Sequence, residues 1–202
     1  MSEKKQRIGI FGGTFNPPHI AHVRVADAFV KALSLDKLLI IPTNDPPHKF
    51  YSGNVSAADR MKMCEIAFSS VPKASVSDIE IARGGKSYTV KTLETIKDDG
   101  KEIFLMCGTD MFLSLDTWFQ AEKIFEMATI CYVRRETDDC VDPLINNARE
   151  KYVSHYGASV VEIPSQVTVV SSTEIRERLS QGNYSDIPQA VAEYIRERKL
   201  YL

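Results

Sequence analysis

The sequence lacks a large net charge of either sign. Its 25 lysines and arginines nearly balance its 27 aspartates and glutamates, which leaves a formal net charge of -2. A protein that binds duplex nucleic acid usually presents a strongly basic surface, because contacts with the phosphate backbone supply much of its affinity. The charge balance therefore argues against a nucleic-acid partner.

Long apolar runs are also missing. No stretch approaches the ~20 apolar residues that a helix needs to cross a bilayer, and no segment suited to a signal peptide follows the polar residues 1–7. These features predict no membrane partner and a cytoplasmic location. The four cysteines form no Cys-x-x-Cys pair, and Cys107 and Cys131 fall in apolar strand-like runs, where we expect reduced core thiols.

What the sequence contains is a regular alternation of strands and helices. The hydrophobic pattern predicts strands at residues 7–11, 37–41, 74–81, 102–107, 129–133 and 159–163. It predicts helices at residues 20–33, 56–70, 88–97, 111–113, 120–127, 142–156, 171–181 and 189–198. Strands separated by helices indicate a doubly wound α/β fold with a mostly parallel sheet. Nothing divides residues 1–202 into more than one domain.

Ligands of such sheets bind beyond the carboxyl ends of the strands. This rule directs attention to four loops, residues 12–22, 42–54, 108–118 and 134–140. The loop at 42–54 contains three prolines and is longer than typical connections, which usually indicates function or mobility.

The first of these loops joins a strand to a helix through paired glycines. Unpaired amides and the positive end of a helix dipole favour phosphate at such a place. The segment matches neither the Walker P-loop nor the G-x-G-x-x-G dinucleotide pattern. Instead it carries His19 and His22, whose spacing puts both side chains on one face of the helix. A zinc pair is the alternative, although no cysteine or clustered carboxylate supplies the remaining ligands.

A second polar segment begins a helix near the end of the sequence. Ser171 and Glu174 have the spacing of a capping box, and Ile175 and Leu179 form the apolar side of the helix. Arg176 lies on another face. Taken alone, this segment indicates only a helix start.

Together the two segments resemble the signatures of the adenylyltransferases that share the His-x-Gly-His motif. The first signature is Gly12-Gly13-Thr14-Phe15-Asn16-Pro17-Pro18-His19-Ile20-Ala21-His22, and the second is Ser171-Ser172-Thr173-Glu174-Ile175-Arg176. The sequence further resembles one branch of this family, the bacterial nicotinate mononucleotide adenylyltransferases. The matching segments are Pro46-Pro47-His48-Lys49, Ser87-Tyr88-Thr89, Gly108-Thr109-Asp110, Trp118 and the segment from Val191 to Tyr201. The resemblance covers nearly the whole chain and implies a Rossmann-like nucleotidyltransferase fold with C-terminal helices.

The resemblance also implies which residues meet ATP. His19 and His22 would hold the α- and β-phosphate oxygens, while Lys49 and Arg176 would neutralise the remaining phosphate charge. An arginine fork suits a polyphosphate better than a lysine does. The other residues expected to bind the nucleotide are Gly12, Gly13, Thr14, Phe15, Asn16, Ser171, Ser172 and Thr173.

The acceptor is expected to bind on the other side of the site. By resemblance Trp118 stacks on a pyridine ring, a sensible platform for a flat aromatic ligand. Amides in the Ser87-Tyr88-Thr89 segment would receive a carboxylate, and Asp110, just after Gly108, would accept a hydrogen bond from a ribose hydroxyl. Arg135 best matches the arginine of a family Arg-Pro-Gly segment. That segment reads Arg134-Arg135-Glu136-Thr137 here, which leaves the role of Arg134 open.

Two further positions depart from the family pattern. Ala21 stands where the family has glycine, and it adds a methyl group close to the expected adenosine. Alanine is intrinsically favoured over glycine in a helix, so we expect the change to be tolerated. Asn16 stands where aspartate is common.

The implied reaction joins ATP and nicotinate mononucleotide into deamido-NAD and pyrophosphate. Magnesium is expected on the ATP phosphates, with no protein ligands required. Other acceptors in the superfamily, nicotinamide mononucleotide or phosphopantetheine, and a cytidylyltransferase activity are alternatives, as is a catalytically silent nucleotide-binding regulator. The Ser87-Tyr88-Thr89 segment with Trp118 argues against the pantetheine and cytidylyl branches. The oligomeric state is not readable from the sequence, and a homodimer is among the states it allows.

Overall fold

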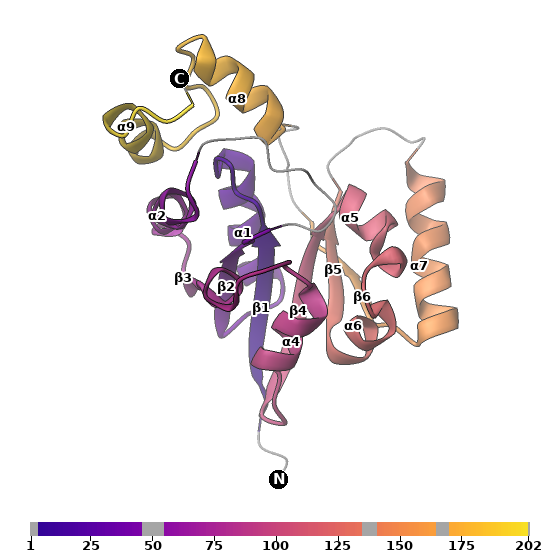
Figure 1. Ribbon diagram of the computed structural model, residues 1–202. Helices are drawn as coiled ribbons and strands as arrows, with labels where there is room; N and C mark the ends of the chain where they lie inside the picture. Colours follow the sequence, from indigo (N-terminus) through magenta and orange to yellow (C-terminus); the bar gives the residue numbers. More distant parts are fainter. Residues whose placement is uncertain (1–3, 46–54, 135–140, 165–169, 202) are drawn as a thin grey trace.

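The computed structural model describes residues 4–45, 55–134, 141–164 and 170–201. The predicted doubly wound α/β fold is confirmed by a six-stranded sheet in the order β3-β2-β1-β4-β5-β6, in which every neighbouring pair is parallel (Figure 1). Its strands are β1 (Gln6–Gly13), β2 (Lys37–Pro42), β3 (Ala74–Val76), β4 (Lys101–Gly108), β5 (Thr129–Val133) and β6 (Val160–Glu162).

The helices lie mostly where the apolar periodicity predicts them. They are α1 (Ile20–Ala32), α2 (Ala57–Phe68), α3 (Ile79–Arg83), α4 (Thr89–Ile96), α5 (Thr109–Leu113), the 3-10 helix η1 (Leu115–Thr117), α6 (Ala121–Met127), α7 (Asp142–Tyr156), α8 (Ser172–Ser180) and α9 (Gln189–Glu197). No helix within the described ranges is long and apolar enough to cross a membrane.

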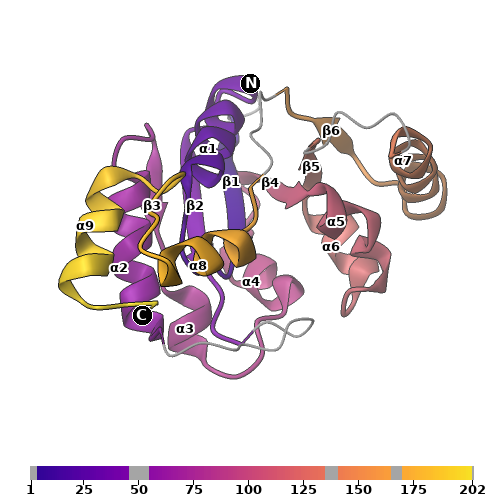
Figure 2. The same cartoon turned by 90° about the horizontal axis from the view of Figure 1, so that it is seen from above.

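Each face of the sheet carries its own apolar core, because successive side chains of a strand point to opposite faces. In β4, Phe104 and Met106 join the core that α1, α2, α8 and α9 cover. Leu105 and Cys107 alternate with them and join the core under α4, α5, α6 and α7. Burial on both faces explains why the strands read as continuous apolar runs. Viewed from above, the two sets of helices lie around the curved row of strands (Figure 2).

One predicted strand, residues 74–81, is wrong over its second half. The strand β3 pairs with β2 only as far as Val76, and the chain then turns into the short helix α3. The apolar residues Val76 and Ile79 are three positions apart, which already breaks the alternation of a strand. A tertiary contact also favours the helix at this place. The buried Glu80 carboxylate of α3 accepts a hydrogen bond from the Thr92 hydroxyl of α4 at 2.7 Å.

The strand order places a crevice at the carboxyl ends of β1 and β4. The first half of the chain adds strands on one side of β1, and β4 then pairs with its opposite side. Helices that follow these two strands therefore diverge to opposite faces, and this switch point is where ligands of such sheets bind. Figure 1 shows α8 and α9 near the same end of the sheet, on the side of α1 and α2.

Candidate functional site

The loop of residues 14–19, here called the first loop, connects β1 to α1 and is anchored by Phe15. This residue adopts a left-handed backbone with φ of 48°, and its side chain is 2% exposed. Its ring makes edge-on contacts with Phe11 and Phe68 at centroid distances of 5.5 and 5.6 Å. A Cβ atom at Gly13 would come within 3.1 Å of the Phe15 ring, so the second glycine of the signature makes room for this anchor.

The two histidines of the first signature lie together at the start of α1, as their spacing predicts. Their rings stack with centroids 3.6 Å apart, and His19 is 3% exposed. They form a reciprocal capping box, in which the backbone N–H of His19 donates to Nδ1 of His22 at 3.2 Å. Because Nδ1 accepts this bond, neutral His22 carries its proton on Nε2.

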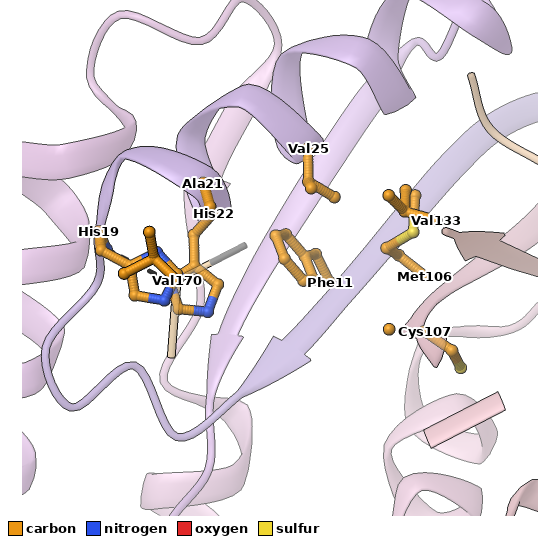
Figure 3. A pocket seen from close by; sticks show the side chains of 10 residues that line it. Phe11, His19, Ala21, His22, Val25, Met106, Cys107, Val133 and Val170 are labelled. Atoms are coloured by element: carbon orange, nitrogen blue, oxygen red, sulfur yellow. Dashed lines mark hydrogen bonds between the residues drawn. The ribbon is translucent and has the colours of Figure 1, made fainter. Parts of the chain in front are cut away.

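A pocket lies beside the histidines at the switch point of the sheet (Figure 3). Its lining comes from β1, α1, the ends of β4 and β5, and the segment before α8: Phe11, His19, Ala21, His22, Val25, Met106, Cys107, Gly108, Val133 and Val170. The methyl group of Ala21 is thus part of the pocket wall. Gly108 contributes to the same wall.

The thiol at the rim of this pocket is held in its protonated form. Cys107 is 1% exposed, and burial raises the pKa of its thiol to about 12. Cys131 is completely buried on the neighbouring strand, and burial raises its pKa as well. The prediction of reduced core thiols is confirmed for both, and neither supplies a thiolate at neutral pH.

The second signature forms the capping box that its spacing predicts. The Ser171 hydroxyl accepts from the backbone N–H of Glu174 at 3.2 Å, and the Glu174 carboxylate accepts from the backbone N–H of Ser171 at 2.9 Å. This backbone N–H, helped by the Ser171 hydroxyl, lowers the pKa of Glu174. The Glu174 carboxylate is therefore engaged in capping the helix. Thr173 is exposed on the first turn.

The two signatures, about 160 residues apart in sequence, meet at the first loop. Arg176 donates from Nη1 to the carbonyl of Asn16 at 2.9 Å and from Nη2 to the Thr173 hydroxyl at 3.1 Å. The Ser172 hydroxyl donates to the carbonyl oxygen of Pro17 at 3.4 Å. Fold geometry therefore brings a guanidinium and a helix start to the same loop that carries the histidine pair.

The Ser87-Tyr88-Thr89 segment lies at the start of α4 and is bonded to the loop after β2. The buried Ser87 hydroxyl accepts from the backbone N–H of Asn44 at 2.9 Å, and the Ser87 N–H donates to the carbonyl of Asp45 at 2.9 Å. Ser87 thus joins the start of α4 to the loop that follows β2. The ring of Tyr88 lies against Phe119, with centroids 4.8 Å apart.

Trp118 and Asp110 lie on the segment that follows β4. Trp118 is partly buried and borders a hollow of about 270 Å³, together with Asp116, Lys123 and Tyr156 among others. Its neighbour Phe119 is 48% exposed. Asp110 is exposed on the first turn of α5, two residues after Gly108, which lines the pocket.

Two predicted site residues, Lys49 and Arg135, lie outside the described residues. Arg134 is described, and it forms ion pairs with Asp142 at 2.7 Å and with Glu162 at 3.6 Å. Its guanidinium thus joins the end of β5 to α7 and β6.

The structure adds residues that sequence reasoning missed. Arg60 is 2% exposed on α2, and its Nη1 donates to the carbonyl of Thr14 at 2.9 Å. The carbonyl of Asp186 accepts from the N–H of Ile20, the first residue of α1, at 2.8 Å. Neither residue belongs to a motif, so no local signal could have found them. Phe119 had one signal, its position next to Trp118.

The zinc alternative finds no support among the residues described. No group of three or more His, Cys, Asp or Glu side chains within them is arranged to hold a metal ion. The side chains that meet the first loop include the guanidinium groups of Arg60 and Arg176 and the two imidazoles, a set suited to an anion.

Comparison with known proteins places this geometry in context. The family model for cytidylyltransferase-like proteins matches residues 10–178. The chain is 35% identical to a probable nicotinate-nucleotide adenylyltransferase of Geotalea daltonii, over 96% of this chain and 98% of that protein. It is 33% identical to the probable nicotinate-nucleotide adenylyltransferase of Desulfatibacillum aliphaticivorans, over 97% of this chain and all of that one.

Solved structures agree in fold. The chain resembles the Plasmodium falciparum nicotinic acid mononucleotide adenylyltransferase complexed with NaAD, with a TM-score of 0.77, 19% identity and 97% of each chain covered. It also resembles a putative nicotinate-nucleotide adenylyltransferase from Vibrio parahaemolyticus, with a TM-score of 0.65, 22% identity and coverage of 97% of this chain and 95% of that one. At these identities the likeness establishes the architecture alone.

Proposed function

Because the chain belongs to the cytidylyltransferase-like family, and within it to the nicotinate-nucleotide adenylyltransferases, we propose that it transfers the adenylyl group of ATP to nicotinate mononucleotide. The products are deamido-NAD and pyrophosphate, a step of NAD biosynthesis. One observation carries the proposal beyond sequence likeness. The histidine pair and Arg176, from opposite ends of the chain, meet on one loop at the switch point of the sheet.

The reaction needs alignment and charge stabilisation rather than a protein nucleophile. A phosphate oxygen of the mononucleotide bonds to the α-phosphorus of ATP, and the bond from that phosphorus to the oxygen bridging to the β-phosphorus breaks. In this proposal His22 donates from Nε2 to a phosphate oxygen, while its Nδ1 stays engaged by the amide of His19. The ring of His19, stacked on that of His22, would bring a second imidazole to the same phosphates. Donors fixed in advance stabilise developing charge at little reorganisation cost.

Arg176 and Lys49 would share the charge of the leaving pyrophosphate. The planar fork of Arg176 is already oriented by the Asn16 carbonyl and the Thr173 hydroxyl, which leaves fewer rotamers to be lost when phosphate binds. The start of α8 lies at the same loop, where the Ser172 hydroxyl donates to the carbonyl of Pro17. The first-turn N–H groups of Ser172 and Thr173 would be offered to phosphate, since the N–H groups of Ser171 and Glu174 are engaged in the capping box.

Magnesium would enter with ATP. The guanidinium groups at the first loop favour phosphate oxygens and repel a cation. A magnesium ion would therefore be held by phosphate oxygens and water, with no protein side chain required as a ligand. When bound, it supplies additional neutralisation of phosphate charge.

The acceptor would bind along the segments that follow β2 and β4. Tyr88 and Phe119 form an aromatic pair there, and Trp118 directly precedes Phe119 in the chain. A pyridine ring stacks favourably on such surfaces. The start of α4 at Thr89 offers N–H groups for a carboxylate, and the exposed Asp110 offers an acceptor for a ribose hydroxyl.

Replacing Trp118 by alanine is expected to raise the KM for the mononucleotide about tenfold, since stacking of a base on an aromatic ring contributes ~1–3 kcal/mol. The KM for ATP should change less than twofold. Steady-state kinetics with each substrate varied in turn measures both constants, and Phe119→Ala serves as a parallel variant on the Tyr88 side. An equal rise of both KM values in Trp118→Ala would contradict stacking on the acceptor.

The activity itself is tested by pyrophosphate release from ATP with one acceptor at a time: nicotinate mononucleotide, nicotinamide mononucleotide and phosphopantetheine. We expect release with nicotinate mononucleotide and an equal amount of deamido-NAD. Release with phosphopantetheine alone would transfer the chain to another branch of the superfamily. ATP binding without release for every acceptor would support the silent regulator and end the enzyme proposal. The ratio of kcat/KM for the two pyridine mononucleotides decides which of them is the substrate, because unpaired buried polar groups make such choices steep.

A further inference from the structure

The backbone of the first loop is held by remote parts of the chain. The carbonyl of Thr14 accepts from Arg60 of α2, and the carbonyl of Asn16 accepts from Arg176 of α8. At the far end of the loop, the N–H of Ile20 donates to the carbonyl of Asp186. Since His19 and His22 follow this loop directly, its backbone conformation determines where the two imidazoles lie.

Tyr201 contacts the same loop from the other end of the chain. Its hydroxyl donates to Oδ1 of Asn16 at 2.5 Å, and Asn16 is 5% exposed. Asn16 is thus held twice by the C-terminal region, at its carbonyl by Arg176 and at its side chain by Tyr201. An amide oxygen buried to this degree needs a donor, because burial without one is unfavourable.

The position of Tyr201 is fixed by α9 and the turn that follows it. Its backbone has a left-handed φ of 63°, a conformation that a residue with a side chain adopts only when other contacts impose it. Those contacts include the apolar core on the α1 side of the sheet, against which Leu200 and Tyr201 pack, and the N–H of Leu200, which donates to the carbonyl of Ile195 at 3.0 Å. The tail therefore presents the hydroxyl in a defined place.

The helix α9 is itself bound to α2 through Asp59. The Tyr194 hydroxyl donates to the Asp59 carboxylate at 2.9 Å, and Arg198 donates to it at 3.3 Å. The hydrogen bond from Ser56, followed by those from Tyr194 and Arg198, lowers the pKa of Asp59 despite its burial. Asp59, Tyr194 and Arg198 thus anchor the C-terminal unit, by which we mean α9 and the residues up to Tyr201. None of the hydrogen bonds described for these three residues is to the first loop.

We propose that Tyr201 is a positioning residue of the ATP site, whose hydroxyl acts through Asn16 to hold the first loop in the conformation that presents His19 and His22 to the phosphates. The inference rests on the proposed function and adds to it a residue that touches no substrate. A loop that can shift by a fraction of an ångström misplaces the phosphate donors, which lowers the rate of a reaction that depends on alignment. The acceptor, bound on the far side of the switch point, is not affected.

The test compares Tyr201→Phe with Tyr194→Phe. Each substitution removes one hydroxyl from the C-terminal unit, but only Tyr201 contacts the first loop. We expect Tyr201→Phe to lower kcat/KM for ATP about tenfold with the KM for the mononucleotide unchanged within twofold. Tyr194→Phe should lower the Tm and leave both kinetic constants within twofold. Equal kinetic losses in the two variants, or normal kinetics in Tyr201→Phe, would overturn the proposal.

A double-mutant cycle with Asn16→Ala tests the route. If Tyr201 acts through Asn16, the double variant is no worse than Asn16→Ala alone, whereas additive losses would show an independent effect and overturn the proposed route. Calorimetric titration of each variant with ATP separates this inference from the proposed function. Weaker ATP binding in Tyr201→Phe than in Tyr194→Phe supports the positioning role even if the wild-type protein fails to turn over nicotinate mononucleotide; equal ATP affinities would count against it.

Discussion

Replacing His19 or His22 by alanine is expected to lower kcat roughly a hundredfold or more, because in the proposed mechanism each imidazole donates to phosphate oxygens as charge develops on them. The two rings are stacked at 3.6 Å, so the loss of either one also frees its neighbour to move. The combined loss should therefore be smaller than the product of the single losses. Steady-state kinetics at saturating ATP and acceptor measures the effect.

Two controls separate chemistry from folding. His155→Ala removes an exposed histidine from α7 and should leave turnover unchanged. His22→Gln retains a side chain that can accept the His19 amide in the capping box, so the Tm should recover more than kcat does. Turnover within twofold of wild type in His19→Ala and His22→Ala would remove the pair from the mechanism.

Replacing Arg176 by alanine is expected to lower kcat/KM for ATP by about a hundredfold. The substitution removes the guanidinium that we propose binds the ATP phosphates, and it also releases the carbonyl of Asn16. Both ATP binding and alignment should therefore be impaired. Arg176→Lys should recover part of the loss, since it keeps the charge but not the planar fork. Kinetics with ATP as the varied substrate distinguishes the three proteins.

The matched control for Arg176 is Arg149→Ala, which removes an exposed arginine from α7 on the other face of the sheet. Its kinetic constants should equal those of the wild type. Two results would contradict the assignment of Arg176 to the ATP phosphates. The first is a normal kcat/KM for ATP in Arg176→Ala. The second is an equal rise of the KM in the alanine and lysine variants that is confined to the mononucleotide.

The local part of the fold is predictable from the sequence because it depends on short-range patterns. The apolar runs of β1 and β4 and the capping box from Ser171 to Glu174 each have a signal within a few residues. The failure at residues 79–81 shows the limit of such patterns. Ile79 and Ile81 keep the two-residue spacing of a strand, although the three-residue step from Val76 to Ile79 has already broken the alternation. The buried contact between Glu80 and Thr92 adds a tertiary reason for the helix.

The candidate site divides in the same way. The histidine pair is readable because both rings lie within one turn of helix, and Arg176 is readable through its resemblance to a family signature. Nothing in the sequence indicates that Asn16 receives hydrogen bonds from both Arg176 and Tyr201, or that Arg60 supports Thr14 from beneath. These residues come from four separate segments of the chain, and tertiary packing brings them together.

By itself, then, the sequence determined the α/β class, the parallel sheet, the two signatures and the chemistry that their side chains can offer. Tertiary structure decided the strand order, the switch point between β1 and β4, and the fixing of the first loop by α2, α8 and the segment after α9. The physical reason is range. Periodicity, capping and turns are set by neighbours along the chain, whereas the orientation of a buried amide such as Asn16 is set by donors up to 185 residues away.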